Sequence, residues 1–190
     1  VINAIGDDGL ISADYNPDGL AAAIEAGEGD ALNAQATASM EMLVADMRDG
    51  RTPQKARVEW LVKDKDAESY PTAKVIADAL SVHDVPGAIR ALQPQFPEYE
   101  ALKAALKATT AANAAQRKLI RVNLDRWRWL PRNVGQKYLI ANVPEYQLRL
   151  MTFGKLLKSY RVIVGKSNTA TPQLMADATG IVVHPPWYLP

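Results

Sequence analysis

The spacing of apolar residues changes abruptly near Pro131, and this change limits the folds that are open to the chain. Before Pro131, apolar side chains recur every three or four residues, which is the period of an amphipathic helix. After it, side chains alternate with a period of two, which is the period of a β-strand. The sequence therefore predicts an α+β chain, with an all-α part over residues 1–131 and the first strands of a β-rich part over residues 132–190.

Local signals predict where the helices begin and end. The longest helix is predicted to begin at Asp30, taken as its N-cap, and to end at Gly50, because glycine adopts the left-handed backbone that closes many helices. Asp84 is predicted to cap a helix that ends before Pro94. Pro97 is predicted to open another, because proline in the first helical turn costs no hydrogen bond. Further helices are predicted over residues 20–26, 72–80 and 117–127.

The alternating region predicts a small antiparallel sheet. Strands are predicted over residues 138–143 and 146–151, and a turn at residues 152–155 leads into a returning strand over residues 157–164. A fourth strand is predicted over residues 179–184. Strand edges without a partner favour pairing with other chains, so self-association through these edges is also predicted.

Charge is distributed unevenly along the chain. Residues 1–100 carry 18 acidic and 8 basic side chains, whereas residues 101–190 carry 3 acidic and 14 basic ones. Such asymmetry indicates either two surfaces with different partners or two parts that attract each other. For the basic half, two partner classes fit this charge, nucleic acid and an anionic cell-wall polymer.

A run of arginines with tryptophans between them has two interpretations. It could be a nucleic-acid footprint, or one side of an amphipathic helix that packs Ile120, Leu124 and Trp127 inward and keeps a solvated basic face. We favour the second, because the sequence has no nucleic-acid-binding fold signature and a pI of only about 8.1, and we expect no nucleic-acid partner. The basic residues concerned are Arg117, Lys118, Arg121, Arg126, Arg128 and Arg132.

A second motif near the start also has two interpretations. Residues 14–25 fit the calcium-loop pattern of alternating oxygen ligands, with Gly19 at the turn and Glu25 at the end. Residues 1–13 show no entering helix, however, and Pro17 stiffens the loop. We therefore favour a plain loop followed by a helix that begins near Asp18, and we expect no metal.

The absence of some residue types restricts the chemistry of the chain. It contains no cysteine, so disulfides, thiolate metal sites and cysteine catalysis are excluded within these 190 residues. No apolar run approaches the roughly 18 residues that a membrane span needs. The chain begins at Val1 without a basic and apolar leader, so we expect that a signal peptide has already been removed.

Several short segments, in the order in which they occur, resemble one known family. Asp-Arg-Trp-Arg-Trp-Leu-Pro at residues 125–131 is the most specific of them, and it follows two segments that are similar to the scaffold domain of large periplasmic L,D-transpeptidases. Later segments resemble the opening of the catalytic domain in that family, with His184 where asparagine is usual. The remaining segments are residues 42–51, 92–102, 164–166, 171–172 and 186–190.

The resemblance implies an enzyme of peptidoglycan biosynthesis. Members attack the stem peptide with a cysteine thiolate, expel D-alanine and form 3→3 cross-links through an acyl-enzyme, without a metal or cofactor. They place the cysteine later than any residue in this sequence. We therefore expect a fragment that stops before the catalytic segment, is inert by itself, and comes from a periplasmic, wall-associated enzyme. The alternative is a non-catalytic module that binds peptidoglycan or a partner.

The resemblance also indicates which residues would contact stem peptides. His184, Trp187 and Tyr188 are the predicted substrate-binding residues, because they lie at the end of the predicted fourth strand. His184 could equally pack at a strand end, and the two aromatic rings could equally belong to a core. No catalytic residue is predicted within the chain.

Overall fold

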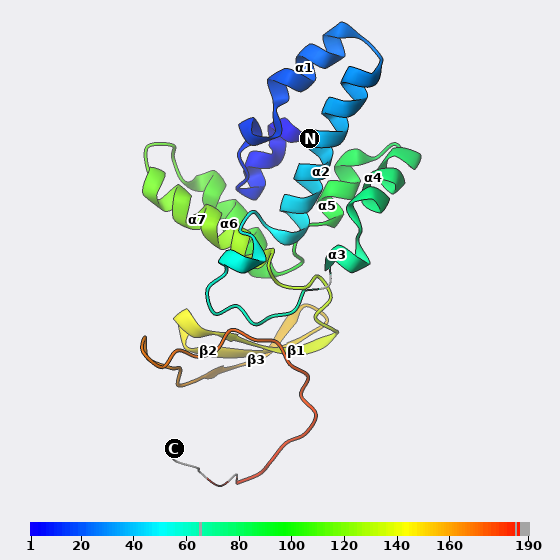
Figure 1. The fold of residues 1–190 in the computed structure, drawn as a ribbon. Helices are drawn as coiled ribbons and strands as arrows, with labels where there is room; N and C mark the ends of the chain where they lie inside the picture. The colour runs from blue at the N-terminus through cyan, green and yellow to red at the C-terminus, as the bar shows by residue number, and fades with distance from the viewer. Residues whose placement is uncertain (65, 185, 187–190) are drawn as a thin grey trace.

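The helices and strands form two distinct layers (Figure 1). The structure is a computed structural model that describes residues 1–64, 66–184 and 186. A helical part occupies residues 2–127, and a small antiparallel sheet lies beneath it. The predicted α+β class is confirmed.

The helices of the described chain follow the predicted order closely. The helix starts predicted at Asp84 and Pro97 lie within one residue of those observed, because local signals set them. The helix predicted over residues 117–127 begins three residues earlier, at Ala114, where the side chain of Asn113 caps it. The 3₁₀ turns are η1 (Ile2–Asp8), η2 (Ser12–Tyr15), η3 (Gln54–Ala56) and η4 (Val143–Glu145). The α-helices are α1 (Pro17–Ala26), α2 (Asp30–Asp49), α3 (Asp66–Ser69), α4 (Thr72–Ser81), α5 (Val85–Ala91), α6 (Pro97–Ala108) and α7 (Ala114–Trp127).

Side-chain caps explain several of these helix starts. Asp84 accepts a hydrogen bond from the backbone N–H of Gly87 at 2.8 Å, as predicted. Asn16 does the same for α1, accepting from Gly19 at 3.2 Å. The predicted cap of α2 is wrong: Asp30 is the first helical residue, and Gly29 stands before it without a side-chain cap. Asp30 still favours the helix there, because its negative charge lies at the positive end of the helix dipole.

Gly50 ends α2 in a backbone conformation that only glycine adopts readily. Its φ is 79° and its ψ is 165°. A Cβ atom at this position would lie 2.9 Å from Oδ1 of Asp125 and 3.0 Å from the ring of Trp129. The predicted glycine stop is confirmed, and its further reason is the close approach of α7 to the end of α2.

Two apolar clusters hold the helical part together. The first joins η1, η2, α2 and α5, and the second joins α6 to α7 through Tyr99, Leu106, Ile120 and Leu124. Leu124 has no exposed surface, and Ile120 keeps only 7%. The predicted inward face of α7 is therefore confirmed. The buried residues of the first cluster are Ile5, Leu10, Tyr15, Leu43, Val44, Met47, Ile89 and Leu92.

The sheet has the strand order β1-β2-β3 and is antiparallel throughout. Its strands are β1 (Lys137–Asn142), β2 (Gln147–Thr152) and β3 (Lys155–Arg161). These three predictions are confirmed. The predicted fourth strand is wrong, because residues 179–184 adopt no strand conformation. A strand is stable only when its backbone groups pair with a neighbour, and alternation along the sequence cannot supply that neighbour.

One face of the sheet is turned toward the helices. Tyr138 and Met151 are paired on this inner face, and Tyr138 contacts the ring of Phe96, the residue before α6, at 6.4 Å between centroids. Arg149, on the same face, donates to Glu98 of α6 at 3.0 Å. Leu139 and Leu150 are paired on the opposite face. The inner face thus fixes the sheet beneath α6.

Candidate functional site

The last residues of α7 and those that follow it make many contacts with distant parts of the chain. This segment covers residues 125–132, which include the most specific of the family-like motifs. We call it the junction segment. Its charged and aromatic side chains contact η1, α2, α5, α6 and the loop after α2. These contacts make it the candidate functional site.

Arg132 connects the junction segment to the ends of two helices. Its Nη2 donates to the carbonyl oxygens of Met47 at 2.9 Å and Arg48 at 2.6 Å, in the last turn of α2. Its Nε donates to the carbonyl of Leu92, just after α5, at 2.8 Å. A cation at these positions is favourable, because helix C-termini carry unpaired carbonyls and partial negative charge.

With Arg132 in place, all four terminal carbonyls of α2 have partners. The carbonyl of Asp46 accepts from the N–H of Gly50 at 3.0 Å. The carbonyl of Asp49 accepts from Arg57 at 2.6 Å, and Arg132 satisfies the two between them. A helix end that leaves carbonyls buried without partners is strongly destabilised, so the junction segment completes α2.

Asp66 balances the charge of Arg132. Both side chains are only 7% exposed, and Nη1 of Arg132 lies 3.7 Å from Oδ2 of Asp66. The same oxygen accepts the backbone N–H of Arg132 at 2.9 Å. Burial lowers the pKa of the Arg132 guanidinium, while Asp66 raises it. Arginine stays protonated under such a shift, so the two groups form a buried ion pair.

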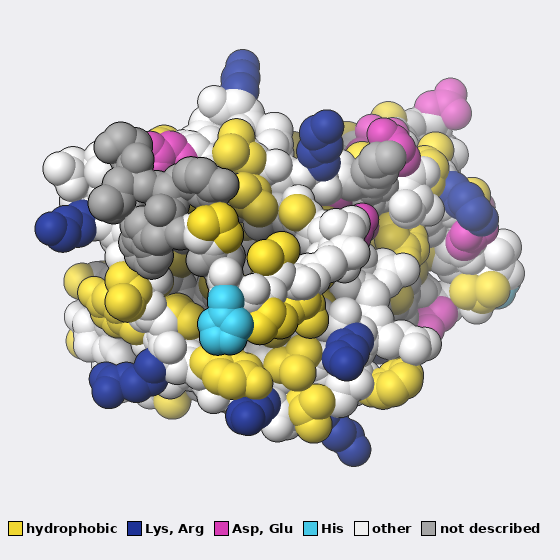
Figure 2. Space-filling model, turned by 90° about the horizontal axis from the view of Figure 1, so that it is seen from below, with side chains coloured by type: hydrophobic (Ala, Val, Ile, Leu, Met, Phe, Trp, Pro, Cys, Tyr) yellow, Lys and Arg dark blue, Asp and Glu magenta, His cyan; other side chains and the backbone are white. Residues whose placement is uncertain are grey.

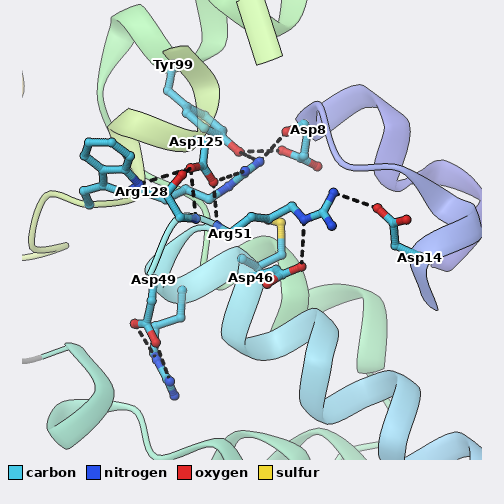
Figure 3. A network of polar contacts seen from close by, with 12 residues as sticks. Asp8, Asp14, Asp46, Asp49, Arg51, Tyr99, Asp125 and Arg128 are labelled. Carbon is cyan, nitrogen blue, oxygen red and sulfur yellow. Dashed lines mark hydrogen bonds and ion pairs between the residues drawn. The ribbon is translucent and has the colours of Figure 1, made fainter. Parts of the chain in front are cut away.

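Arg128 makes a second buried connection, to η1 and α6. Its guanidinium donates to the backbone carbonyl of Asp8 and, at 2.9 Å, to the hydroxyl of Tyr99. That hydroxyl donates in turn to the carboxylate of Asp8 at 3.0 Å. Burial raises the pKa of Tyr99, so the hydroxyl remains a donor at neutral pH. Figure 3 shows the three groups pointing toward one another.

Asp125 holds the loop that follows α2 (Figure 3). Its carboxylate accepts the backbone N–H of Arg51 at 2.6 Å, and the N–H and hydroxyl of Thr52 at 3.3 and 2.8 Å. The indole N–H of Trp129 donates to it at 3.2 Å. A carboxylate with four donors makes strong, charge-assisted hydrogen bonds, so Asp125 fixes this loop against α7.

The two tryptophans of the junction segment pack against different neighbours. Trp127 packs against Phe96 at 4.9 Å between ring centroids, with the two ring planes tilted by 38°. Trp129 meets Trp60 edge to face at 5.4 Å, and the guanidinium of Arg57 lies 4.9 Å from its ring. These contacts bring Arg57 and Trp60 against the residues that follow α7.

The predicted solvated basic face is wrong for Arg128 and Arg132, whose side chains are buried. Arg128 is 1% exposed, and the side chain of Arg132 is 7% exposed. Arg117 also turns inward, donating to the carbonyls of Leu106 and Thr109 at the end of α6. These three arginines therefore donate to groups within the protein, so fewer of the basic side chains are exposed for contact with nucleic acid.

Two ion pairs connect the acidic N-terminal half of the chain to the basic C-terminal half. Arg132 pairs with Asp66, and Arg149 pairs with Glu98. Each pair joins a base of the C-terminal half to an acid of the N-terminal half. Of the two interpretations of the charge asymmetry, attraction between the two parts is the one that the structure supports.

The calcium-loop interpretation is contradicted by the backbone. Residues that would wrap around the ion lie in α1, from Pro17 to Ala26, and a helix cannot direct their oxygens to one point. Asp14 instead pairs with Arg51 at 2.6 Å. The loop-and-helix interpretation is confirmed, with the helix beginning one residue before Asp18.

The predicted substrate-binding residues lie far along the chain from the junction segment. His184 is exposed and has a left-handed backbone, with φ of 53°. Trp187 and Tyr188 lie outside the described residues. A role in substrate binding remains a prediction for all three. Sequence reasoning missed Asp125, Arg128 and Arg132 as connecting residues, although the arginine–tryptophan run just before the change of period was the available signal.

A surface cavity of about 580 Å³ lies beside Trp60 and contains a carboxyl group with a shifted pKa. Burial raises the pKa of Asp64 above its ordinary value, and the N–H of Asp66, which donates to Asp64 at 2.8 Å, partly opposes the rise. Ionised Asp64 therefore weakens the fold. The other residues that line the cavity are Gln54, Leu61, Val62, Lys63 and Glu68.

Replacing Asp64 with asparagine is expected to stabilise the protein at neutral pH. The folded pKa of Asp64 lies above the unfolded one, so the penalty is present above the folded pKa and vanishes below the ordinary value of about 3.9. The free energy of unfolding of Asp64→Asn should therefore exceed that of the parent at neutral pH and converge with it in acid. Urea unfolding across this pH range measures the difference. Glu68→Gln, on the same cavity, is the matched control, and an identical pH trend in both variants would contradict the assignment.

No helix in the described part of the chain has the length and apolar character needed to cross a membrane.

Comparisons with known proteins agree with this organisation. A family model described as a scaffold domain matches residues 1–106, which is more than half of the chain. A segment of 52 residues is 36% identical to a protein of Haemophilus influenzae that carries the name of an L,D-transpeptidase. That match covers 27% of this chain and only 11% of the relative. No solved structure matches the chain. The chain belongs to the scaffold-domain family of the L,D-transpeptidases.

Proposed function

We propose that the chain is the helical scaffold and the beginning of the catalytic β domain of a periplasmic peptidoglycan L,D-transpeptidase. In this proposal the scaffold covers residues 1–131 and the β domain begins at residue 132. The parent enzyme forms 3→3 cross-links between stem peptides through a cysteine acyl-enzyme. The present residues contain no cysteine, so they supply support and not the nucleophile.

The observation that carries this proposal is the rigid connection between the helices and the sheet. Arg132 stands five residues before β1 and is bonded to the ends of α2 and α5. Arg149 and Tyr138 hold the inner face of the sheet against α6 and Phe96. A catalytic site needs its groups held within about half an ångström, and a scaffold that fixes the first strands would provide that support.

The outer face of the sheet supports the same proposal. Leu139 is 55% exposed and Tyr160 is 42% exposed on this face, where Leu148 and Leu150 also lie. Seen from below, this side of the molecule shows apolar side chains among lysines and arginines (Figure 2). The inner face already packs on the helices, and apolar side chains exposed on the other face mark an interaction site. Further chain of the β domain is the occupant that we propose, with His184, Trp187 and Tyr188 lining the stem-peptide groove.

The proposal is tested by release of D-alanine from tetrapeptide stems. The 190-residue chain is expected to release none, whereas a longer chain that includes the downstream cysteine segment is expected to release D-alanine and form 3→3 cross-links. Mass spectrometry of the muropeptides measures both. Turnover by the 190-residue chain, or a folded longer chain that neither turns over nor forms an adduct with a carbapenem, would contradict the proposal.

A second candidate function is a non-catalytic binding module. The helical part carries a groove between α1, α2 and α4 that has an apolar lining and acidic side chains around it. This groove favours a protein partner for such a module. Co-sedimentation of the 190-residue chain with intact sacculi separates the two forms of this candidate, because only a peptidoglycan-binding module is retained.

A further inference from the structure

An apolar groove lies on the helical part, away from the junction segment and the sheet. It is formed by η1, α1, α2, α4 and the start of α5, and its volume is about 530 Å³. Most of its lining is apolar, which is the ordinary character of a binding groove. The apolar residues that line it include Ile2, Leu20, Ile24, Met40, Leu43 and Ile76.

The apolar stripe of α1 lacks a complete partner within the described chain. No residue of α1 is buried, although Leu20 and Ile24 lie one turn apart and both line the groove. Ile24 is 60% exposed, and Leu80 of α4 is also 60% exposed. A helix with an apolar stripe ordinarily buries it, so this stripe is available to another molecule.

Acidic side chains predominate around the groove, and the one lysine of α4, Lys74, is paired with Asp78 at 2.7 Å. Residues 1–47, which supply most of its walls, contain nine carboxylates and no lysine or arginine. Asp18 and Glu25 follow lining residues on α1, and Glu41 follows Met40 on α2. Among the described residues, six of these carboxylates are exposed and form no ion pair: Asp7, Asp18, Glu25, Glu28, Asp30 and Glu41.

We propose that this groove docks a cationic amphipathic helix of a partner protein. The groove wall on α2 runs from Asn33 to Leu43, which is about 15 Å at the rise of an α-helix. Three turns of a helix fit that length, with apolar side chains toward Ile24, Met40 and Leu80, and lysine or arginine toward Glu25 and Glu41. Helix-in-groove recognition uses this combination of an apolar floor and a charged rim.

Other occupants fit the charge less well. An anionic membrane surface would be repelled by the unpaired carboxylates. A second copy of the same groove would bring like charges together, which costs free energy. The acidic rim therefore selects a basic partner.

The test uses a model helix of leucine and lysine about 14 residues long, with one apolar face and a fluorescein label. Fluorescence anisotropy during titration with the 190-residue chain measures its dissociation constant. The double variant Ile24→Ser/Leu80→Ser is expected to weaken binding at least tenfold. Glu25→Gln/Glu41→Gln is expected to weaken it severalfold and to reduce its dependence on salt. A matching helix of leucine and glutamate should not bind.

Matched variants outside the groove show whether the peptide binds at this site or sticks to any exposed apolar or acidic surface. Val58→Ser/Ile163→Ser removes two exposed apolar side chains elsewhere, and Glu59→Gln/Glu68→Gln removes two carboxylates elsewhere. Both should bind like the parent. Equal losses in the groove and control variants would overturn the proposal. So would sedimentation showing that the parent is a dimer that Ile24→Ser/Leu80→Ser dissociates, because the groove would then bind a second copy. All substituted side chains are exposed, so the fold should persist, and circular dichroism checks this.

Discussion

Replacing Arg132 with methionine is expected to lower the free energy of unfolding by about 3 to 5 kcal/mol. Methionine fills a similar volume but leaves the carbonyls of Met47, Arg48 and Leu92 without their donors. It also leaves Asp66 buried without its cation, and an uncompensated buried charge is the largest part of the cost. Urea unfolding followed by circular dichroism measures the change.

Two further substitutions make the Arg132 experiment specific. Arg126→Met is the control, because Arg126 is exposed. Its side chain donates to Gln173 at 3.3 Å and its guanidinium lies 5.7 Å from the ring of Trp129, so a change within about 1 kcal/mol is expected. Arg132→Lys should restore only part of the stability, because one ammonium group cannot donate to all the carbonyls that the planar guanidinium of Arg132 reaches. If Arg132→Met were as stable as the parent, the junction segment would not be the connection that holds α2 and α5.

Replacing Asp125 with alanine is expected to cost about 2 to 4 kcal/mol, the second-largest effect. Four donors would lose their acceptor, and two of them are backbone N–H groups in the loop after α2. The loop contains Arg51 and Thr52, so their protection against hydrogen exchange should fall as well. Urea unfolding gives the free energy, and hydrogen exchange locates the opening.

Asp125→Asn tests whether the stabilisation by Asp125 comes from its negative charge or from the position of its oxygen atoms. An asparagine oxygen can still accept from the loop, but the hydrogen bonds are no longer charge-assisted, so an intermediate loss is expected. Asp78→Ala is the control, because Asp78 is exposed and pairs only with Lys74 on the surface of α4. Equal losses in Asp125→Ala and Asp78→Ala would contradict the role of Asp125.

Asp125 and Arg132, at the two ends of the junction segment, both act on the C-terminal end of α2. Asp125 organises the loop after α2, and Arg132 completes the end of α2. Both act at the point where the helical part gives way to β1. These contacts fix the end of α2 and the loop after it to the segment that leads into β1.

Much of the fold could be predicted because its signals are local. Asp84 and Pro97 mark helix starts through interactions within one turn, and Gly50 marks a helix end through its own backbone. The alternation after Pro131 indicated β1, β2 and β3 for the same reason. The fourth strand failed because residues 179–184 needed a neighbour for pairing, and sequence alternation does not say whether one exists.

The candidate site could be predicted only in part. The arginine–tryptophan run marked the region, and the family resemblance gave it a context. The apolar face of α7 was also evident from the spacing of Ile120 and Leu124. What could not be predicted was that Arg128 and Arg132 are buried, because arginine is usually exposed unless its donors are satisfied.

The sequence by itself determined the order of helices and strands, the helix ends and the change from helical to strand period, because these depend on neighbours within a few residues. Only the tertiary structure decided that Arg132 joins α2 and α5, and that an acidic groove opens between α1, α2 and α4. The carbonyl of Met47 lies 85 residues from Arg132 along the chain. Whether a charge at such a distance is solvated or buried depends on where folding places its partners, and local chemistry does not carry that information.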